Sequence, residues 1–153
     1  MKLVDLIAPN AVRADLESTG KIDALAELGA LLAPSCDGAD AEEITRILVE
    51  RERLATTGVG DGVAIPHGKT DRLGCLAAAV GISRTGISFD AVDGKPVHVF
   101  VALLAPLDST GEHLKALARV SRMLKNAEFR AQLISAASDE EVLRLFVAED
   151  EKH

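Results

Sequence analysis

The stretch from residue 56 to residue 70 reads Thr56-Thr57-Gly58-Val59-Gly60-Asp61-Gly62-Val63-Ala64-Ile65-Pro66-His67-Gly68-Lys69-Thr70. Its glycines at alternate positions permit backbone conformations closed to other residues and leave amide N–H groups open to an anion. We therefore interpret this segment as a phosphate-binding loop, formed by Thr57, Gly58, Gly60, Gly62 and Gly68.

His67 is the candidate nucleophile in this stretch. The apolar run before it leads to Pro66, which fixes one backbone angle and has no amide to donate, so we expect a strand to stop there. His67 then lies at a strand end, followed by Gly68 and Lys69. We expect its imidazole to stand clear of the backbone, where a ligand or a second protein can reach it.

Hydrophobic spacing on either side predicts alternating helices and strands. The predicted strands cover residues 11–16 at an edge, 76–83, 86–89 and 97–104, the last being a continuous apolar run typical of a central strand and ended by Pro106. The first predicted helix covers residues 3–7 and is closed by Pro9-Asn10. The second starts at Ser18 and buries Ile22, Leu25, Leu28 and Leu32, and the third is capped by Asp40 and Glu43. Three more are predicted, one starting at Thr110 and two covering 127–136 and 140–147.

Arg51 falls on the inner face of the helix capped by Asp40, two turns on from Ile44. An arginine there can simply extend along the helix C-terminus, where the macrodipole favours a cation. It can equally project into a site, and the residues alone leave both interpretations open.

His113 falls in the first turn of the helix that begins at Thr110. The helix dipole lowers the pKa of a histidine there and keeps the imidazole neutral, able to donate one N–H to an anion. The expected buried stripe of this helix is Leu114, Leu117, Ser121 and Leu124, with Val120 beside them. A lone helix histidine is more often a surface or packing residue.

Composition bounds the class of protein. At 153 residues the chain has the size of one domain, and its net charge of −7 argues against general binding to nucleic acid or anionic membranes. The N-terminal apolar run is too short and interrupted for a signal peptide or a membrane span. Cys36 and Cys75 lack metal-ligand spacing and fit reduced thiols of a cytosolic protein. Residues 149–153 are expected to be frayed.

Several segments together resemble a known family, the IIA components of the bacterial phosphoenolpyruvate-dependent phosphotransferase system. They are Arg51-Glu52, the stretch from Thr57 to Lys69, Leu104-Ala105-Pro106 and His113-Leu114. The resemblance covers nearly the whole chain. It is greatest to the fructose/mannitol class and, within it, to the stand-alone nitrogen-regulatory IIA proteins.

The resemblance implies a fold, a reaction and partners. The implied fold class is α/β, a mixed β-sheet sandwiched between helices in a single IIA domain over residues 1–148. His67 would be transiently phosphorylated on Nε2 with Arg51 and His113 assisting, and its Nδ1–H would need an acceptor, expected to be a backbone carbonyl. The donor would be an HPr-like phosphocarrier protein, with no metal or other cofactor, in the cytoplasm. The protein would act mainly as a phosphorylation-dependent regulator of target proteins, or alternatively pass phosphate to the cysteine of a sugar-transport IIB domain.

Three other functions compete with this one. Gly68-Lys69-Thr70 resembles the tail of a nucleotide-binding P-loop, but the P-loop requires four residues between its glycines and here five separate Gly62 from Gly68. A metal hydrolase could use Asp61, His67 and His113, although no pair of them has helical ligand spacing. The third alternative is a binding module without chemistry.

Overall fold

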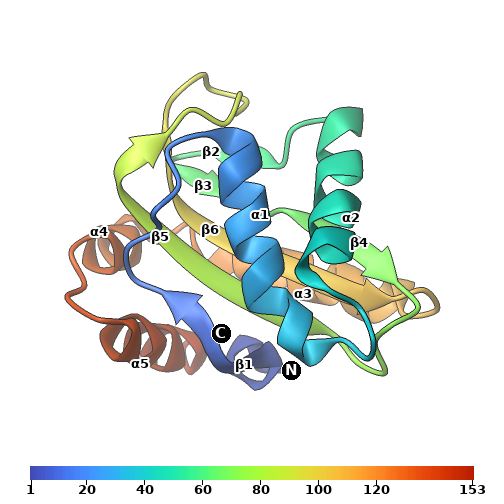
Figure 1. Cartoon of the computed structure of the whole chain (residues 1–153). Coiled ribbons are helices and arrows are strands. Elements are labelled where there is room, and N and C mark those ends of the chain that lie inside the picture. Colours follow the sequence, from blue (N-terminus) through green and yellow to red (C-terminus); the bar gives the residue numbers. More distant parts are fainter.

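The computed structural model describes residues 1–153 and has a six-stranded sheet at its centre (Figure 1). The strands are β1 (Ile7–Arg13), β2 (Gly58–Gly60), β3 (Val63–Ala64), β4 (His67–Thr70), β5 (Ala77–Ile87) and β6 (Val97–Pro106). The helices are α1 (Lys21–Leu32), α2 (Ala41–Leu54), α3 (Thr110–Met123), α4 (Ala127–Ile134) and α5 (Asp139–Asp150), with 3₁₀ turns η1 (Leu3–Leu6) and η2 (Ala33–Ser35). None of these helices is long and apolar enough to cross a membrane.

The sheet is mixed. Its order is β1-β5-β6-β3-β2, and β4 also pairs with β6. β5 and β6 are antiparallel, as are β2 and β3, whereas β1 runs parallel to β5 and both β3 and β4 run parallel to β6. The predicted fold class, a mixed sheet sandwiched between helices, is confirmed.

β6 is the strand that both helical layers cover, as its apolar run predicts. Side chains alternate across a strand, so Phe100, Ala102 and Leu104 pack with α1 and α2 while Val99, Val101 and Leu103 pack with α3, α4 and α5. α1 and α2 lie in front of the sheet in Figure 1, and α3 lies behind it. Pro106 ends the strand as expected.

Two strands differ from their predicted bounds, because each continues through a local irregularity in its pairing with the neighbouring strand. β5 is one strand where two were predicted, since its register shifts between Ile82 and Ile87 and Gly86 adopts a positive φ of 87°. β1 starts at Ile7 and runs through Pro9-Asn10, which were expected to close a helix. A proline is tolerated there because β1 is an edge strand with a register shift of its own.

The helix expected from Ser18 begins only at Lys21. Ser18 is not its cap, because the backbone N–H and hydroxyl of Ser18 both donate to the carboxylate of Glu27. Ile22, expected to be buried, is exposed at the start of the helix. The cap predicted at Asp40 is present, since its side chain accepts a hydrogen bond from the backbone N–H of Glu43.

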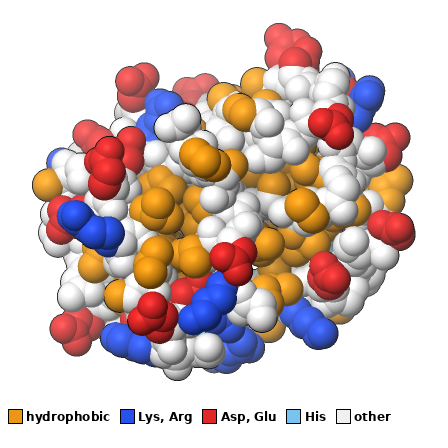
Figure 2. Space-filling model, turned by 90° about the horizontal axis from the view of Figure 1, so that it is seen from below, with side chains coloured by type: hydrophobic (Ala, Val, Ile, Leu, Met, Phe, Trp, Pro, Cys, Tyr) orange, Lys and Arg blue, Asp and Glu red, His pale blue; other side chains and the backbone are white.

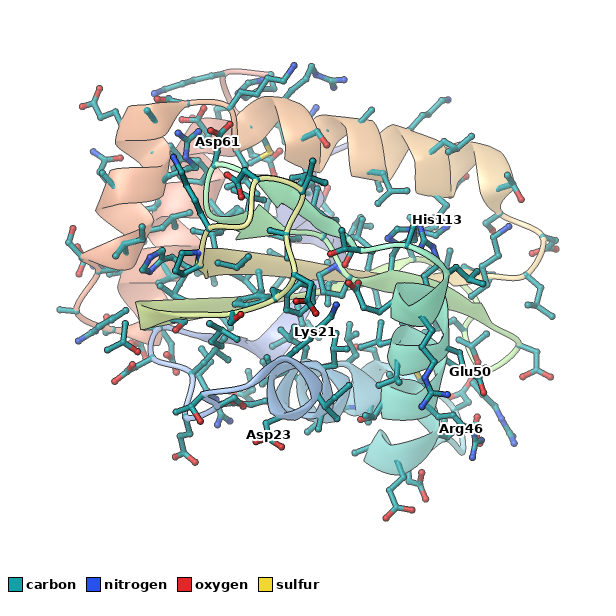
Figure 3. All side chains as sticks on the ribbon, turned by 90° about the horizontal axis from the view of Figure 1, so that it is seen from above. Lys21, Asp23, Arg46, Glu50, Asp61 and His113 are labelled. Carbon is teal, nitrogen blue, oxygen red and sulfur yellow. The ribbon has the colours of Figure 1, made fainter.

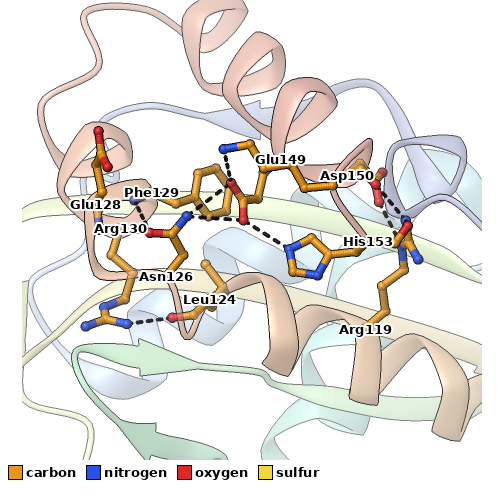
Figure 4. Close-up of polar contacts among 10 residues, drawn as sticks. Arg119, Leu124, Asn126, Glu128, Phe129, Arg130, Glu149, Asp150 and His153 are labelled. Atoms are coloured by element: carbon orange, nitrogen blue, oxygen red, sulfur yellow. Dashed lines mark hydrogen bonds and ion pairs between the residues drawn. The ribbon is translucent and has the colours of Figure 1, made fainter.

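The structure also differs from the expectation of a frayed tail. α5 continues to Asp150, and the side chains of Glu149 and Asp150 are buried. Asp150 accepts hydrogen bonds from Arg119 Nε at 2.8 Å and from the backbone N–H of Val4 at 2.8 Å, and Glu149 pairs with His153 (Figure 4). A buried carboxylate needs such partners, and the bonds of Asp150 fasten the end of α5 to α3 and to the N-terminal segment.

Candidate functional site

The C-terminal turn of α2, the start of β4 and the first turn of α3 converge on one pocket. It has a volume of about 600 Å³ and contains Arg51, His67 and His113. Figure 3 shows His113 on the side of α3 that faces the C-terminal end of α2. The other lining residues are Ile47, Glu50, Leu54, Gly68, Lys69, Thr110, Leu114 and Leu117.

A depression of similar volume, about 610 Å³, lies between β1 and α5. Figure 2 shows the underside of the molecule, where hydrophobic side chains form patches interrupted by charged ones. No histidine or cysteine lines this depression, and its Arg13 and Asp139 are engaged with Glu27 and the backbone N–H of Ala14. The histidine pocket is therefore the candidate site.

His67 is the first residue of β4. Its imidazole was expected to stand clear of the backbone, but it does not. Its Nδ1 lies 2.8 Å from the carbonyl oxygen of Ile65, and the ring is half-buried. A carbonyl can only accept, so Nδ1 carries the proton and Nε2 keeps its lone pair. This carbonyl is the acceptor that the sequence could not identify. Burial lowers the pKa of His67, an effect that the hydrogen bond to Ile65 opposes and the charge of Arg51 increases.

A strand ends before Pro66, as predicted, since β3 stops at Ala64 and β4 begins at His67. The interruption is only local. Val63 lies opposite Val99 of β6 and His67 opposite Leu103, so β3 and β4 keep one register on β6 across Ile65 and Pro66. The carbonyl of Pro66 accepts a bond from the backbone N–H of Leu103. The proline interrupts only one donor, and β6 fixes the backbone that carries His67.

His113 is deeply buried, with 5% of its surface exposed. Its ring centroid lies 5.4 Å from that of His67 with the rings at 76°, and its Nε2 is buried without a hydrogen-bond partner. Burial, then the neighbouring His67 and Lys69, lower the pKa of His113 to about 4. The predicted neutral imidazole is therefore present, with burial as its main cause.

The buried stripe predicted for α3 is shifted by one position in the first turns of the helix, whereas Val120 and Leu124 are buried as expected. Its buried residues are His113, Ala116, Arg119, Val120 and Met123. Leu114, expected inside, is instead 62% exposed at the rim of the pocket. The prediction from hydrophobic spacing was wrong here because the helix buries His113 and leaves the neighbouring Leu114 exposed.

Arg51 fits both interpretations that the sequence left open. Its Nη1 donates to the carbonyl of Ala55 at 3.0 Å, as an arginine at a helix C-terminus can. The side chain also lines the pocket with His67 and His113, and its charge lowers the pKa of His67. One side chain thus closes α2 and supplies a cation to the site.

The three hairpin glycines of the predicted loop do not line the two pockets that contain His67. Gly58, Gly60 and Gly62 form the β2–β3 hairpin, with φ of 99° at Gly60 and 75° at Gly62, and none of them lines a pocket with His67. The backbone N–H of Gly58 donates to Thr56 Oγ1, and that of Asp61 donates to Asp93. These glycines serve a tight turn, and the amides of Gly58 and Asp61 already have partners.

Thr57 and Gly68, the remaining residues of the predicted loop, do reach the site. Thr57 lines a smaller pocket of about 180 Å³ together with Arg51 and His67. Gly68 lines the main pocket, and a Cβ there would collide with Ile47 of α2. Gly68 thus lets α2 approach β4 closely enough to bring Arg51 beside His67.

The structure argues against two of the alternative functions, the nucleotide-binding P-loop and the metal hydrolase. Gly68-Lys69-Thr70 is strand β4 in register with β6, whereas a P-loop wraps around phosphate before a helix. Asp61 lies in the hairpin turn and lines a different pocket from His67 and His113, so the three do not form a ligand set.

Sequence reasoning assigned no role to Glu52, which is buried beneath the site with 6% of its surface exposed. Its carboxylate accepts hydrogen bonds from the backbone N–H and the hydroxyl of Thr57, and it pairs with Lys21 at 3.0 Å. The sequence did contain a signal for such a role. Glu52 continues the buried face of Ile44 and Leu48 on α2, and a buried charge requires partners.

The fold and the pocket define an α/β domain with a histidine-centred site. Residues 5–148 match the family model described as phosphoenolpyruvate-dependent sugar phosphotransferase system, EIIA 2. The chain therefore belongs to the IIA family of this phosphotransferase system, as the sequence resemblance predicted, and IIA domains are phosphotransfer proteins.

Both kinds of IIA protein are found among the relatives. The chain is 39% identical to a nitrogen regulatory protein of Bradyrhizobium diazoefficiens over 87% of this chain and 86% of the relative. It is 37% identical to the fructose-specific EIIA component of Haloferax volcanii, over 93% of this chain and 87% of that protein. The crystal structure of nitrogen regulatory protein IIA-Ntr from Neisseria meningitidis superposes with a TM-score of 0.86 at 32% identity, covering 94% of this chain and 98% of that one.

The lowered pKa of His113 predicts a stability that depends on pH. As pH falls from about 6.5, the unfolded chain takes up a proton on His113 that the folded protein resists until about pH 4. The free energy of unfolding should therefore fall over this window, by at most about 3 kcal/mol from this residue. Denaturant unfolding at several pH values should show a weaker pH dependence for His113→Asn than for wild type.

His98→Gln is the matched control for this measurement, since His98 lies on β6 outside the pocket and bonds to the carbonyl of Ser83. Identical pH dependence in wild type and His113→Asn would contradict the prediction.

Proposed function

We propose that this protein is a phosphocarrier that accepts a phosphoryl group on Nε2 of His67 from the phosphohistidine of an HPr-like protein. The observation that carries the proposal is the hydrogen bond from His67 Nδ1 to the carbonyl of Ile65. It commits the proton to Nδ1 and leaves the Nε2 lone pair for attack, in a pocket shared with Arg51 and His113.

The transfer exchanges one phosphorus–nitrogen bond for another. The lone pair of His67 Nε2 forms the new bond to phosphorus, and the bond between phosphorus and the donor imidazole breaks with its electron pair remaining on the donor nitrogen. Such transfers pass through a loose transition state, so the protein contributes mainly position and charge compensation.

Arg51 and His113 supply that compensation. The planar guanidinium of Arg51 can hold two phosphoryl oxygens at once, which an ammonium cannot do equivalently. His113 has a lowered pKa and is neutral, so with its proton on the buried Nε2 it donates a hydrogen bond to a third oxygen. Lys69, held by Thr110 Oγ1 at 3.0 Å, adds positive charge at the pocket wall.

The rim of the pocket favours a protein as the donor. Leu54 is 81% exposed and Leu114 is 62% exposed, and both line the pocket around His67. Val59, also exposed, lines the adjoining smaller pocket. Exposed apolar side chains around a polar centre are typical of protein interaction surfaces. The same surface suits a IIB domain or a regulated target protein as the second partner.

The first prediction from this function is that His67→Ala abolishes phosphorylation and leaves the fold intact. Incubation with phosphoenolpyruvate and the general phosphocarrier enzymes should add one acid-labile phosphate to the wild-type protein. Mass spectrometry before and after acid treatment measures it. A phosphate that survives acid, or that appears on the alanine variant, would exclude His67 as the acceptor.

The second prediction is that Arg51→Lys slows transfer although it keeps the charge, because the bidentate guanidinium is lost. Single-turnover transfer from the phosphocarrier should slow by more than about threefold, the equivalent of somewhat under 1 kcal/mol of barrier. Arg46→Lys on the exposed face of α2 is the matched control and should transfer at the wild-type rate. Equal rates for both variants would place Arg51 outside the reaction.

The regulatory role predicts a charge switch. Phosphorylation adds roughly −1.5 to −2 charge in the middle of an apolar rim, and desolvating that charge can cost several kcal/mol. A target protein captured by the unphosphorylated form should bind His67→Ala equally well and the phosphorylated form at least about tenfold more weakly. Calorimetric titration measures this. Equal affinities, together with onward transfer to a IIB cysteine, would instead favour the sugar-transport role that the fructose-specific relative suggests.

A further inference from the structure

We propose that Glu52, compensated by Lys21, is a positioning residue that fixes the tautomer of His67 by holding Thr57, and through Thr57 the carbonyl of Ile65. The inference rests on the proposed function in that it explains how His67 is prepared for attack. It concerns residues that the reaction itself does not touch.

The first link is the clamp on Thr57. One oxygen of the Glu52 carboxylate accepts from the backbone N–H of Thr57 at 3.0 Å and also from the Thr57 hydroxyl. The second carboxylate oxygen lies 3.1 Å from the same backbone N–H. Thr57 itself is buried, with 4% of its surface exposed. Charge-assisted bonds from two donors of one residue define its position more closely than a single neutral bond would.

The second link runs from Thr57 to His67. The carbonyl of Thr57 accepts from the backbone N–H of Ile65 at 3.0 Å, and the carbonyl of Ile65 accepts from His67 Nδ1 at 2.8 Å. Three successive hydrogen bonds therefore join the carboxylate to the imidazole. Ile65 lies between β3 and β4 and is not itself paired with β6, so Thr57 is the partner that holds its backbone N–H.

Lys21 makes a buried carboxylate tolerable at this place. Its Nζ lies 3.0 Å from Glu52, 3.5 Å from Asp90 and 4.9 Å from the ring centroid of Phe89. An isolated buried carboxylate would be costly, and the neighbouring ammonium group compensates its charge. Figure 3 shows Lys21 at the start of α1, on the opposite side of the sheet from α3.

A second role for Glu52 reinforces the first. Arg51 precedes it in α2, so the clamp that ties the last turn of α2 to Thr57 also fixes where Arg51 leaves the helix. The negative charge of Glu52 also raises the pKa of His67, opposing the effect of Arg51. A purely structural carboxylate would affect stability without altering the imidazole, and this difference can be measured.

Two double variants separate the clamp from the charge. Glu52→Gln with Lys21→Met removes both charges but keeps an amide oxygen that can accept from Thr57. Glu52→Leu with Lys21→Met is equally uncharged and has no acceptor. ¹⁵N NMR of the His67 ring, at a pH where it is neutral, reports the fraction of the tautomer with the proton on Nδ1.

The wild-type protein and the glutamine variant should show His67 protonated on Nδ1. The leucine variant should show a mixture of tautomers and slow single-turnover transfer by at least about tenfold, with the KM for the phosphocarrier unchanged. Glu149→Gln is the control, because Glu149 is an equally buried carboxylate on α5 away from the site. It should leave both the tautomer and the rate as in wild type.

An unchanged tautomer in a folded leucine variant would overturn the proposal. If circular dichroism shows that this variant does not fold, Thr57→Val, which removes only the hydroxyl donor, replaces it and should shift the tautomer in the same direction by less. The NMR readout needs no phosphorylation. A tautomer that depends on Glu52 in a protein that never becomes phosphorylated would therefore refute the proposed function and not this inference.

Discussion

The site depends on the pairing of a single backbone segment with β6. β3 and β4 hold one register on this strand from Val63 to Thr70, and Pro66 interrupts the N–H donors without interrupting the path. β6 is buried on both faces and antiparallel to β5, as is typical of the most stable strands of a fold. His67, the proposed nucleophile, is fastened to this strand and loses little orientational freedom when a partner docks, as the proposed positioning-dominated reaction requires.

The electrostatics of the pocket follow from which groups the two layers bury. His67 and His113 lie between α2 and α3, where burial lowers the pKa of both rings and keeps both neutral at physiological pH. Two adjacent imidazolium ions would repel each other and Arg51. In the proposed function, the neutral pair instead offers one lone pair and one N–H donor to an incoming phosphoryl group. The cations of the site, Arg51 and Lys69, are placed at its walls.

The sequence predicted the layers and the central residues but not the details that depend on packing. The apolar run of β6, the cap at Asp40 and the helix beginning at Thr110 are local signals, and each was confirmed. The face of α3 was misjudged because hydrophobic periodicity favours burying Leu114, whereas the tertiary structure buries His113. A count of apolar residues cannot identify a polar residue that the tertiary structure buries.

The glycine loop shows the same limit from the other side. Gly58, Gly60 and Gly62 suggested open amides. In the structure the amide of Gly58 donates to Thr56, and the amide of Asp61 donates to Asp93, which lies in a distant segment of the chain. Whether a backbone N–H is free is a tertiary property, which spacing in the sequence does not contain. The same reasoning explains why Glu52 received no role. Its partners Thr57 and Lys21 lie on different elements, and only the fold shows that a buried carboxylate on α2, a lysine on α1 and the carbonyl that orients His67 belong to one hydrogen-bonded unit.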